Sequence, residues 1–446
     1  MARAQDGGGA TLAKAPIDAR IRAAIAEVDA ARIEADVRKL CGFGTRHVLS
    51  RTDSDTEGTG AARRWLKAEY ERIAAGNNRL TVRFQNATVP CTRRGMPSEV
   101  DLVNVVATLR GTTDPERIYV VSGHYDSRNG DGGDGKAAAP GAVDDASGTA
   151  VALEACRVLS KQSFAATILF CAYDGEEQGL LGSKAHATLL AEGDAAVDGM
   201  ITCDIVGNSR GMDGQLYDGF VRCFSYAPTG SDSFGRSLAR VLSRAGRGYV
   251  DDFDVKLIFR GDRYGRGGDH RSFFDQGYPA IRLTEPREDF SRQHQNIRDR
   301  DGKPYGDLPD YADFDYSANV ARIVVASLAE LASAPPPPLC SNARLARDAY
   351  DTLLVYQPQD PAVRVEFVVR ETTEPDWTAV IGMDEAEIQP TRSGRLLARL
   401  KGVCLDDVVV GVRSVGRDGA RSRVATPPEP DRFAQRQKSN RTRRGR

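Results

Sequence analysis

The stretch Ile118-Tyr-Val-Val-Ser-Gly-His124-Tyr-Asp126 decides the fold of this 446-residue chain. Its apolar run is short enough for a buried strand, and the strand ends in a histidine and an acid. Four more apolar runs have the same character, and helical patterns separate them: residues 102–109, 167–172, 200–203 and 280–283. The alternation of strands and helices predicts the α/β class, with a mixed, mainly parallel sheet sandwiched by helices.

A run of four prolines divides the chain. Residues 333–338, Ser-Ala-Pro-Pro-Pro-Pro, predict a stiff, extended linker. Before the linker we place an N-terminal extension and helix at residues 1–34 and the α/β domain at residues 35–332. After it, short alternating strands at residues 339–428 predict a small β-sandwich, and residues 429–446 follow as a basic tail.

The composition is that of an ordinary globular protein. Hydrophobic residues make up 41% and charged residues 28%, which excludes a wholly disordered or collagen-like chain. With 61 Lys and Arg against 62 Asp and Glu, the net charge of −1 gives no support for a nucleic-acid partner. No run of about 18 apolar residues occurs, so the sequence predicts no transmembrane segment.

The basic tail has two interpretations. Residues 431–446 hold seven Lys or Arg and one acid, so this segment has a net positive charge and the rest of the chain has a net negative charge. Because the tail has almost no apolar residues, its composition favours a disordered, solvated segment over a basic patch for an acidic partner.

The N-terminal residues and the cysteines give information about where in the cell the protein is located. Residues 1–9 contain no apolar stretch of the kind that a signal peptide needs, whereas the β-sandwich and the proline linker favour export. We therefore expect a secreted or periplasmic protein, although no signal is visible. Export would permit disulfides, for which Cys41 with Cys91 and Cys340 with Cys404 are candidate pairs.

Acids and histidines follow the predicted strands. Strand ends in a parallel sheet share one edge, so these side chains are expected to gather there. Histidines and carboxylates without cysteine suit Zn²⁺ or a similar divalent ion. Each motif also has a structural reading, as a turn for His124 and for Glu176-Glu177, and as a helix cap for Asp144-Asp145. The set is His124, Asp126, Asp144, Asp145, Glu176, Glu177, Asp204 and His294.

The order of these motifs resembles a known family. His124-x-Asp126, Asp144-Asp145-x-Ser-Gly148, Glu176-Glu177-x-Gly179, Asp204 and His294 are similar to the co-catalytic di-zinc aminopeptidases of the bacterial secreted and aminopeptidase Y-like type. The resemblance covers about residues 35–332. It implies a zinc exopeptidase fold, two Zn²⁺ ions per chain and a peptide or protein substrate.

The resemblance also implies a role for each residue. His124 and Asp204 would hold one zinc, and Glu177 and His294 would hold the other. Asp144 would bridge the two ions, and the peptide bond between Asp144 and Asp145 would be cis. Asp126 would orient His124. Glu176 would be the general base that activates a metal-bridging water and returns the proton to the leaving amine.

One position departs from the family pattern. Many relatives carry a tyrosine directly before the last metal histidine, where this chain has Gln293. Gln293 or Tyr264 is therefore the expected donor to the oxyanion. Arg266, in an arginine-rich segment, is a candidate for binding a substrate carboxylate, although pairing with the acids of the body is the alternative. His186 has polar neighbours and is expected at the surface.

The last domain resembles a fibronectin type III domain, most clearly at residues 408–424. Val363, Val365, Phe367 and Val369 alternate onto one face, as do Val408, Val410 and Val412. The domain carries no catalytic cluster, so its expected function is attachment, presentation of the substrate or stabilisation of the protein. For the whole chain we expect a zinc-dependent aminopeptidase. The alternatives are a carboxypeptidase, a glutaminyl cyclase, which would need one metal, and a non-catalytic binding ectodomain, which would have lost ligands.

Overall fold

The computed structural model describes residues 18–227 and 232–428. They form two compact units. The first consists of residues 18–225 and 238–333, and the second contains residues 334–428 together with the described part of residues 226–237. The predicted basic tail and the start of the N-terminal extension lie outside the described residues.

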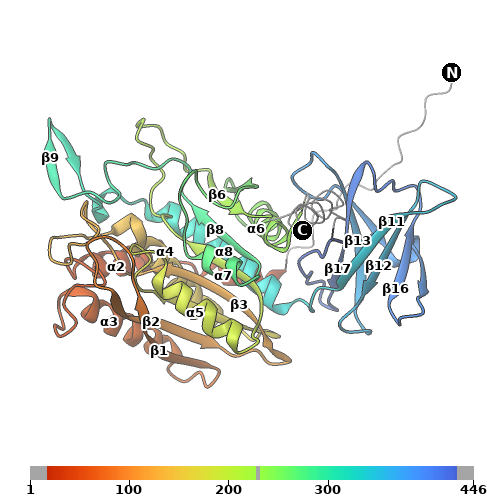
Figure 1. Cartoon of the computed structure of the whole chain (residues 1–446), viewed down its shortest axis with the longest axis horizontal. Helices are drawn as coiled ribbons and strands as arrows, with labels where there is room; N and C mark the ends of the chain where they lie inside the picture. Colours follow the sequence, from red (N-terminus) through yellow and green to blue (C-terminus); the bar gives the residue numbers. More distant parts are fainter. Residues whose placement is uncertain (1–17, 228–231, 429–446) are drawn as a thin grey trace, which may run out of the picture. The chain divides into compact units, whose positions relative to one another are not determined.

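A mixed sheet of eight strands forms the centre of the first unit (Figure 1). In spatial order the strands are β1 (Leu80–Pro90), β2 (Glu99–Leu109), β4 (Ala166–Tyr173), β3 (Asp114–His124), β5 (Ala196–Cys203), β8 (Ala280–Thr284), β6 (Phe220–Ser225) and β7 (Asp254–Ile258). The four central strands β4, β3, β5 and β8 are parallel. Their carboxyl ends therefore share one edge, as the sequence predicted. Every residue of β4 is buried, which is typical of a strand that is covered on both faces.

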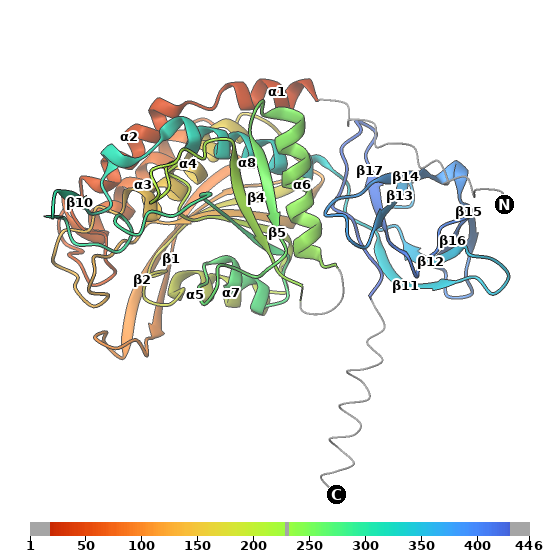
Figure 2. The same cartoon turned by 90° about the horizontal axis from the view of Figure 1, so that it is seen from above.

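Helices cover both faces of this sheet, which confirms the predicted α/β class (Figure 2). One face packs against the larger core, to which α1 (Ala19–Ala26), α2 (Ala30–Cys41), α3 (Gly58–Ala74), α4 (Ser147–Leu159), α6 (Phe234–Tyr249) and α8 (Phe314–Ser333) contribute. The other face packs against α5 (Leu181–Glu192) and α7 (His270–Asp275) through a smaller cluster that includes Phe273. A short hairpin of β9 (Arg298–Arg300) and β10 (Lys303–Tyr305) follows β8 in the chain.

The structure corrects one prediction about this layer. His186 was expected at the surface, but it lies on the inner side of α5 and is fully buried. Its Nδ1 atom is 3.0 Å from the hydroxyl of Tyr173, and its ring makes an edge contact with Phe273. Because burial lowers the pKa of His186 to about 3, the ring is a neutral core residue.

The second unit is a β-sandwich. One sheet has the order β11 (Leu339–Leu345), β12 (Thr352–Gln357), β16 (Leu396–Leu400), β15 (Glu387–Pro390), and the other has β14 (Ala379–Gly382), β13 (Arg364–Glu371), β17 (Val408–Val415). Val365, Phe367, Val410 and Val412 are buried between the sheets, as their alternation predicted. The described part of residues 226–237 packs with this unit, where Ser237 Oγ donates to the Val424 carbonyl at 2.7 Å.

All eight cysteines are free thiols in the structure, so neither candidate disulfide is formed. Cys156, Cys171 and Cys203 are fully buried. Among residues 18–227 and 232–428, no helix combines the length and the apolar character that a membrane crossing requires.

Asp36 on α2 gives a prediction about stability. Burial, together with the nearby carboxylates of Glu69 and Glu154, raises the pKa of Asp36 from 3.8 to about 7. The unfolded chain therefore loses this proton near pH 4, whereas the folded protein keeps it until about pH 7, so the folded state becomes less stable as the pH rises between these values. We expect Asp36→Asn to increase the free energy of unfolding at pH 8 by about 1–2 kcal/mol, discounted from about 1.4 kcal/mol per pKa unit because Asp36 is partly exposed.

Urea unfolding of the wild type and of Asp36→Asn at pH 8 and at pH 4 measures this effect. The variant should be more stable at pH 8 and equal to the wild type at pH 4. A gain of the same size at both pH values would show that the charge of Asp36 is not its cause.

Candidate metal centre

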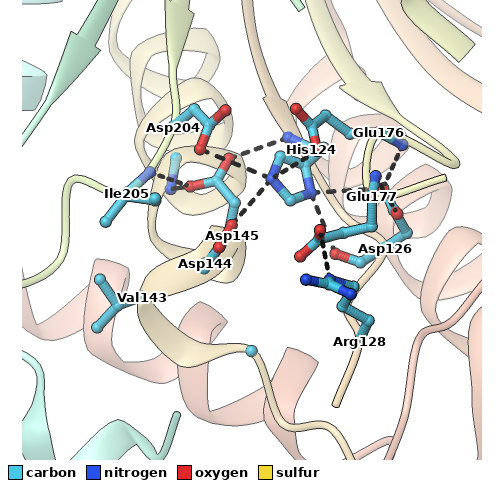
Figure 3. A network of polar contacts seen from close by, with 12 residues as sticks. His124, Asp126, Arg128, Val143, Asp144, Asp145, Glu176, Glu177, Asp204 and Ile205 are labelled. Carbon is cyan, nitrogen blue, oxygen red and sulfur yellow. Dashed lines mark hydrogen bonds and ion pairs between the residues drawn. The ribbon is translucent and has the colours of Figure 1, made fainter. Parts of the chain in front are cut away.

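Asp145 ties together the elements that carry the site (Figure 3). Its Oδ2 accepts a hydrogen bond from the His124 N–H at the end of β3, at 3.0 Å. Its Oδ1 accepts from the N–H groups of Gly148 at the start of α4, at 2.9 Å, and Ile205 just after β5, at 3.1 Å. Asp145 is fully buried, so these bonds replace the water that its carboxylate loses. One carboxylate thus fixes three segments that are distant in sequence.

The glycine of the Asp-Asp-x-Ser-Gly motif has a steric reason. A Cβ atom on Gly148 would lie 1.9 Å from the Cys203 carbonyl oxygen and 2.6 Å from Asp145 Oδ2. Only glycine therefore allows α4 to begin this close to β5. The peptide bond between Asp144 and Asp145 is cis, as the resemblance implied.

Asp144 stands between two groups of side chains whose oxygen and nitrogen atoms converge. The first group is His124, Asp144 and Asp204, and the second is Asp144, Glu177 and His294. Within each group, the candidate ligand atoms all lie within 4.8 Å of one another. Asp144 Oδ1 is 3.2 Å from His124 Nε2, and Asp144 Oδ2 is 3.0 Å from His294 Nε2. The two oxygens of one carboxylate thus face different groups.

The donor atoms fit divalent cations. His124 Nε2 and Glu177 Oε1 are buried, and each faces another candidate ligand atom: Asp144 Oδ1 lies 3.2 Å from His124 Nε2, and His294 Nε2 lies 2.8 Å from Glu177 Oε1. Such a concentration of buried polar atoms is costly, unless an ion completes it. The three carboxylates and two imidazoles also suit Zn²⁺, which takes nitrogen and oxygen ligands. The structure therefore brings together all five residues that the sequence analysis chose as ligands.

The electrostatics agree with a cation site. Burial alone would raise the pKa of Asp144, but the imidazoles of His124 and His294 hold it well below its ordinary value. Burial works against charge on His294, but Glu177 and Asp144 raise its pKa to about 10. The cluster thus attracts positive charge strongly.

Asp126 and Glu176 complete the site. Asp126 Oδ1 is 3.4 Å from His124 Nδ1, and the carboxylate also accepts hydrogen bonds from the N–H groups of Glu176, at 3.1 Å, and Glu177, at 3.2 Å. It therefore holds both the imidazole and the glutamate loop. Glu176 Oε2 lies 4.0 Å from His124 Nε2. Burial, together with the charges of Asp204 and Glu177, raises the pKa of Glu176 well above its ordinary value, which suits a group that must accept and release a proton.

Several supporting residues were missed by the sequence analysis. Arg128 Nε is 3.0 Å from Glu177 Oε2, and Arg282 Nη2 is 2.8 Å from Asp204 Oδ1. Asp307 accepts hydrogen bonds from the N–H groups of Val143 and Asp144, at 2.9 and 2.8 Å. Arg46 is fully buried and donates to the carbonyls of Tyr125, Leu40, Pro140 and Gly141. Arg128 stands two positions after Asp126 in the sequence, but nothing in that spacing predicts its contact with Glu177.

Two backbone conformations also mark the site. Ile205, directly after Asp204, has φ 64°, and His294 has φ 52°. The left-handed region is unfavourable for residues with a side chain, and such residues gather at functional sites, where the surrounding structure holds them in place.

The three predicted substrate residues lie in different environments. A cleft of about 1190 Å³ opens over the two groups, and its lining includes Arg266 and Gln293. The amide of Gln293 donates to Glu285 Oε1 at 3.3 Å, so its N–H is engaged away from the metal groups. Arg266 pairs with Glu288. Tyr264 is 91% exposed and does not line the cleft.

Comparisons with known proteins agree with this site. Residues 104–313 match Peptidase family M28. A probable zinc metalloprotease of the fungus Leptosphaeria maculans is 39% identical over 426 residues, which cover 91% of this chain and 96% of the relative. The LapA aminopeptidase of Legionella pneumophila has a similar fold, with a TM-score of 0.54, 22% identity, and coverage of 74% of this chain and 78% of that chain. A glutaminyl cyclase of Porphyromonas gingivalis gives a TM-score of 0.50 at 18% identity, covering 68% of this chain and 98% of that one.

The chain has the zinc exopeptidase fold, and its two groups of ligand atoms could each hold a metal ion. The chain belongs to Peptidase family M28, and its fungal relatives are zinc metalloproteases, so it is a zinc metallopeptidase. The predicted fold and metal are confirmed at this level. The finer predictions, namely the aminopeptidase Y-like type, the count of two Zn²⁺ ions and the fibronectin type III domain, stay proposals.

Proposed function

We propose that the protein is an aminopeptidase that removes N-terminal residues from peptides. The observation that carries the proposal is the position of Asp144, which faces both ligand groups while Glu176 lies 4.0 Å from His124 Nε2. His124, Asp144 and Asp204 would hold one zinc ion, and Asp144, Glu177 and His294 would hold the second. When bound, such an ion pair lowers the pKa of water and polarises the substrate carbonyl.

The protein supplies the proton transfers. Glu176 takes a proton from the attacking water and gives it to the amine that leaves, because its buried carboxylate exchanges protons more readily than an exposed one near neutral pH. Asp126 keeps His124 in one orientation and fixes the loop of Glu176, so the base and the ligands keep a constant geometry. Gln293 and Arg266, which line the cleft, would contact the substrate, and Tyr264 would contact only substrate that extends beyond the cleft lining.

A panel of chromogenic substrates tests the activity. Aminoacyl derivatives with a free N-terminus should be hydrolysed, whereas N-blocked peptides with a free C-terminus should not. Hydrolysis of the second set alone would make the protein a carboxypeptidase. Cyclisation of N-terminal glutamine with one metal per chain would make it a glutaminyl cyclase.

Metal removal gives an independent check. Because the ligand set is made of imidazoles and carboxylates, which bind Zn²⁺ reversibly, a chelator should reduce activity to background, and added Zn²⁺ should restore it. Elemental analysis should find two zinc ions per chain before chelation. Activity that persists after complete removal of metal would contradict the assignment of the site.

We also propose that the protein is secreted or periplasmic and that the β-sandwich has the fibronectin type III fold and serves attachment. Two antiparallel sheets with a shared apolar core support the second part. Deletion of residues 334–446 should then leave the hydrolysis of small substrates intact and abolish any retention on the target surface.

A further inference from the structure

The cleft over the candidate metal centre carries more positive charge than its own carboxylates balance. Part of this charge is matched. Arg263 Nη1 lies 3.0 Å from Glu288, Arg266 also pairs with Glu288, and Arg282 lies between Asp204 and Asp262. The charges of these arginines are therefore balanced by carboxylates of the protein.

A second set of cations lacks such partners. Arg93 and Lys184 both line the cleft, and neither forms an ion pair within the described part of the chain. Arg93 donates to the backbone carbonyl of Glu177, and Lys184 Nζ donates to the carbonyl of Gly179 at 2.8 Å. Both charges therefore lie against the loop that carries Glu176 and Glu177. Backbone carbonyls orient these side chains but do not neutralise them.

Arg128 adds a third positive charge at the same place. Among the described residues its one carboxylate partner is Glu177, at 3.0 Å, and its Nη2 atom also lies 2.7 Å from His294 Nδ1. Arg128 and Arg93 also face the same glycine, because a Cβ atom on Gly132 would lie 3.0 Å from Arg128 Nη1 and 3.1 Å from Arg93 Nη2. Two guanidinium groups side by side repel each other, unless an anion lies between them. If Glu177 serves as a metal ligand, it cannot balance both.

We propose that Arg93, Arg128 and Lys184 form a subsite that binds a carboxylate group of the peptide substrate. This inference rests on the proposed function, since it names the substrate class of that cleft. Guanidinium groups bind carboxylates through two parallel hydrogen bonds, and a lysine adds a mobile point charge. The carboxylate belongs either to an Asp or Glu side chain or to the free C-terminus of a short peptide.

Binding to an inactive enzyme tests the subsite without turnover. The metal-loaded Glu176→Gln protein is titrated by calorimetry with short peptides that have a free N-terminus. One arm compares a C-terminal acid with the C-terminal amide, and the other compares Glu with Gln at each position. We expect at least one arm to show binding about ten-fold tighter for the carboxylate, with a preference that weakens as salt increases. Whichever arm shows it identifies the source of the carboxylate.

Variants connect the preference to the named residues. Added to Glu176→Gln, Arg93→Gln and Lys184→Gln should each reduce the preference several-fold, whereas Arg94→Gln should leave it unchanged, because Arg94 is the exposed neighbour that does not line the cleft. Equal affinity for acidic and neutral peptides in both arms would overturn the subsite, as would an equal loss of preference in Arg94→Gln. Failure of the proposed function would be seen in a different experiment, in which the metal-loaded wild type would not hydrolyse peptides.

Discussion

Glu176→Gln should reduce kcat by about 10²–10⁴-fold and leave the metal content unchanged, because removing a general base costs roughly this factor. The amide keeps the size of the side chain but cannot accept the proton of the attacking water. Glu176 belongs to neither group of converging ligand atoms, so its replacement should not release an ion. Steady-state kinetics together with elemental analysis of the same sample measure both effects.

The neighbouring glutamate supplies a matched control. Glu177 carries the same side chain one position later, and it belongs to the group that also contains His294. Glu177→Gln should therefore lose metal as well as activity. Turnover within ten-fold of the wild type in Glu176→Gln would remove Glu176 from the role of base, and loss of metal in that variant would place it among the ligands.

Asp144→Asn should have the largest effect on metal content. Asp144 is the residue that the two groups share, and its two oxygens lie 3.2 Å from His124 Nε2 and 3.0 Å from His294 Nε2. An asparagine offers one oxygen in place of two and carries no charge, so both ions should bind much more weakly. Elemental analysis after dialysis should find less than one zinc per chain, with activity at background.

Asp204→Asn and Asp145→Asn are the comparisons for this variant. Asp204 belongs to one group only, so its replacement should remove one ion and leave the other. Asp145 accepts hydrogen bonds from three backbone N–H groups, so its replacement should lower the melting temperature more than it lowers the affinity for metal. If Asp144→Asn retained two tightly bound ions, the shared position of Asp144 would have no role in metal binding.

The sequence predicted the residues that end strands better than the residues that support them. His124, Glu176 and Asp204 follow apolar runs, and the parallel arrangement of β4, β3, β5 and β8 requires their ends to meet. Asp144 and Asp145 could not be told apart by pattern alone. Both acids stand at a helix start. The family resemblance assigned the bridge to Asp144, and the structure shows that Asp144 faces the histidines while Asp145 holds the backbone.

The supporting residues were out of reach for a physical reason. Arg282 lies within β8 and Asp307 lies in the segment before α8, so their contacts with Asp204 and Asp144 depend on how distant segments pack. His186 shows the same limit, because the polar residues around it in sequence are not its neighbours in space. The direction of the Gln293 amide was equally hidden, since it is set by Glu285.

The backbone hydrogen bonds that Asp145, Asp126 and Asp307 accept have a consequence for how the enzyme matures. These three carboxylates position the ligand-bearing segments through amide groups of the chain itself. The folded backbone itself thus sets the positions of the coordinating side chains. We therefore expect protein from which a chelator has removed Zn²⁺ to keep its fold and to take up Zn²⁺ again without unfolding.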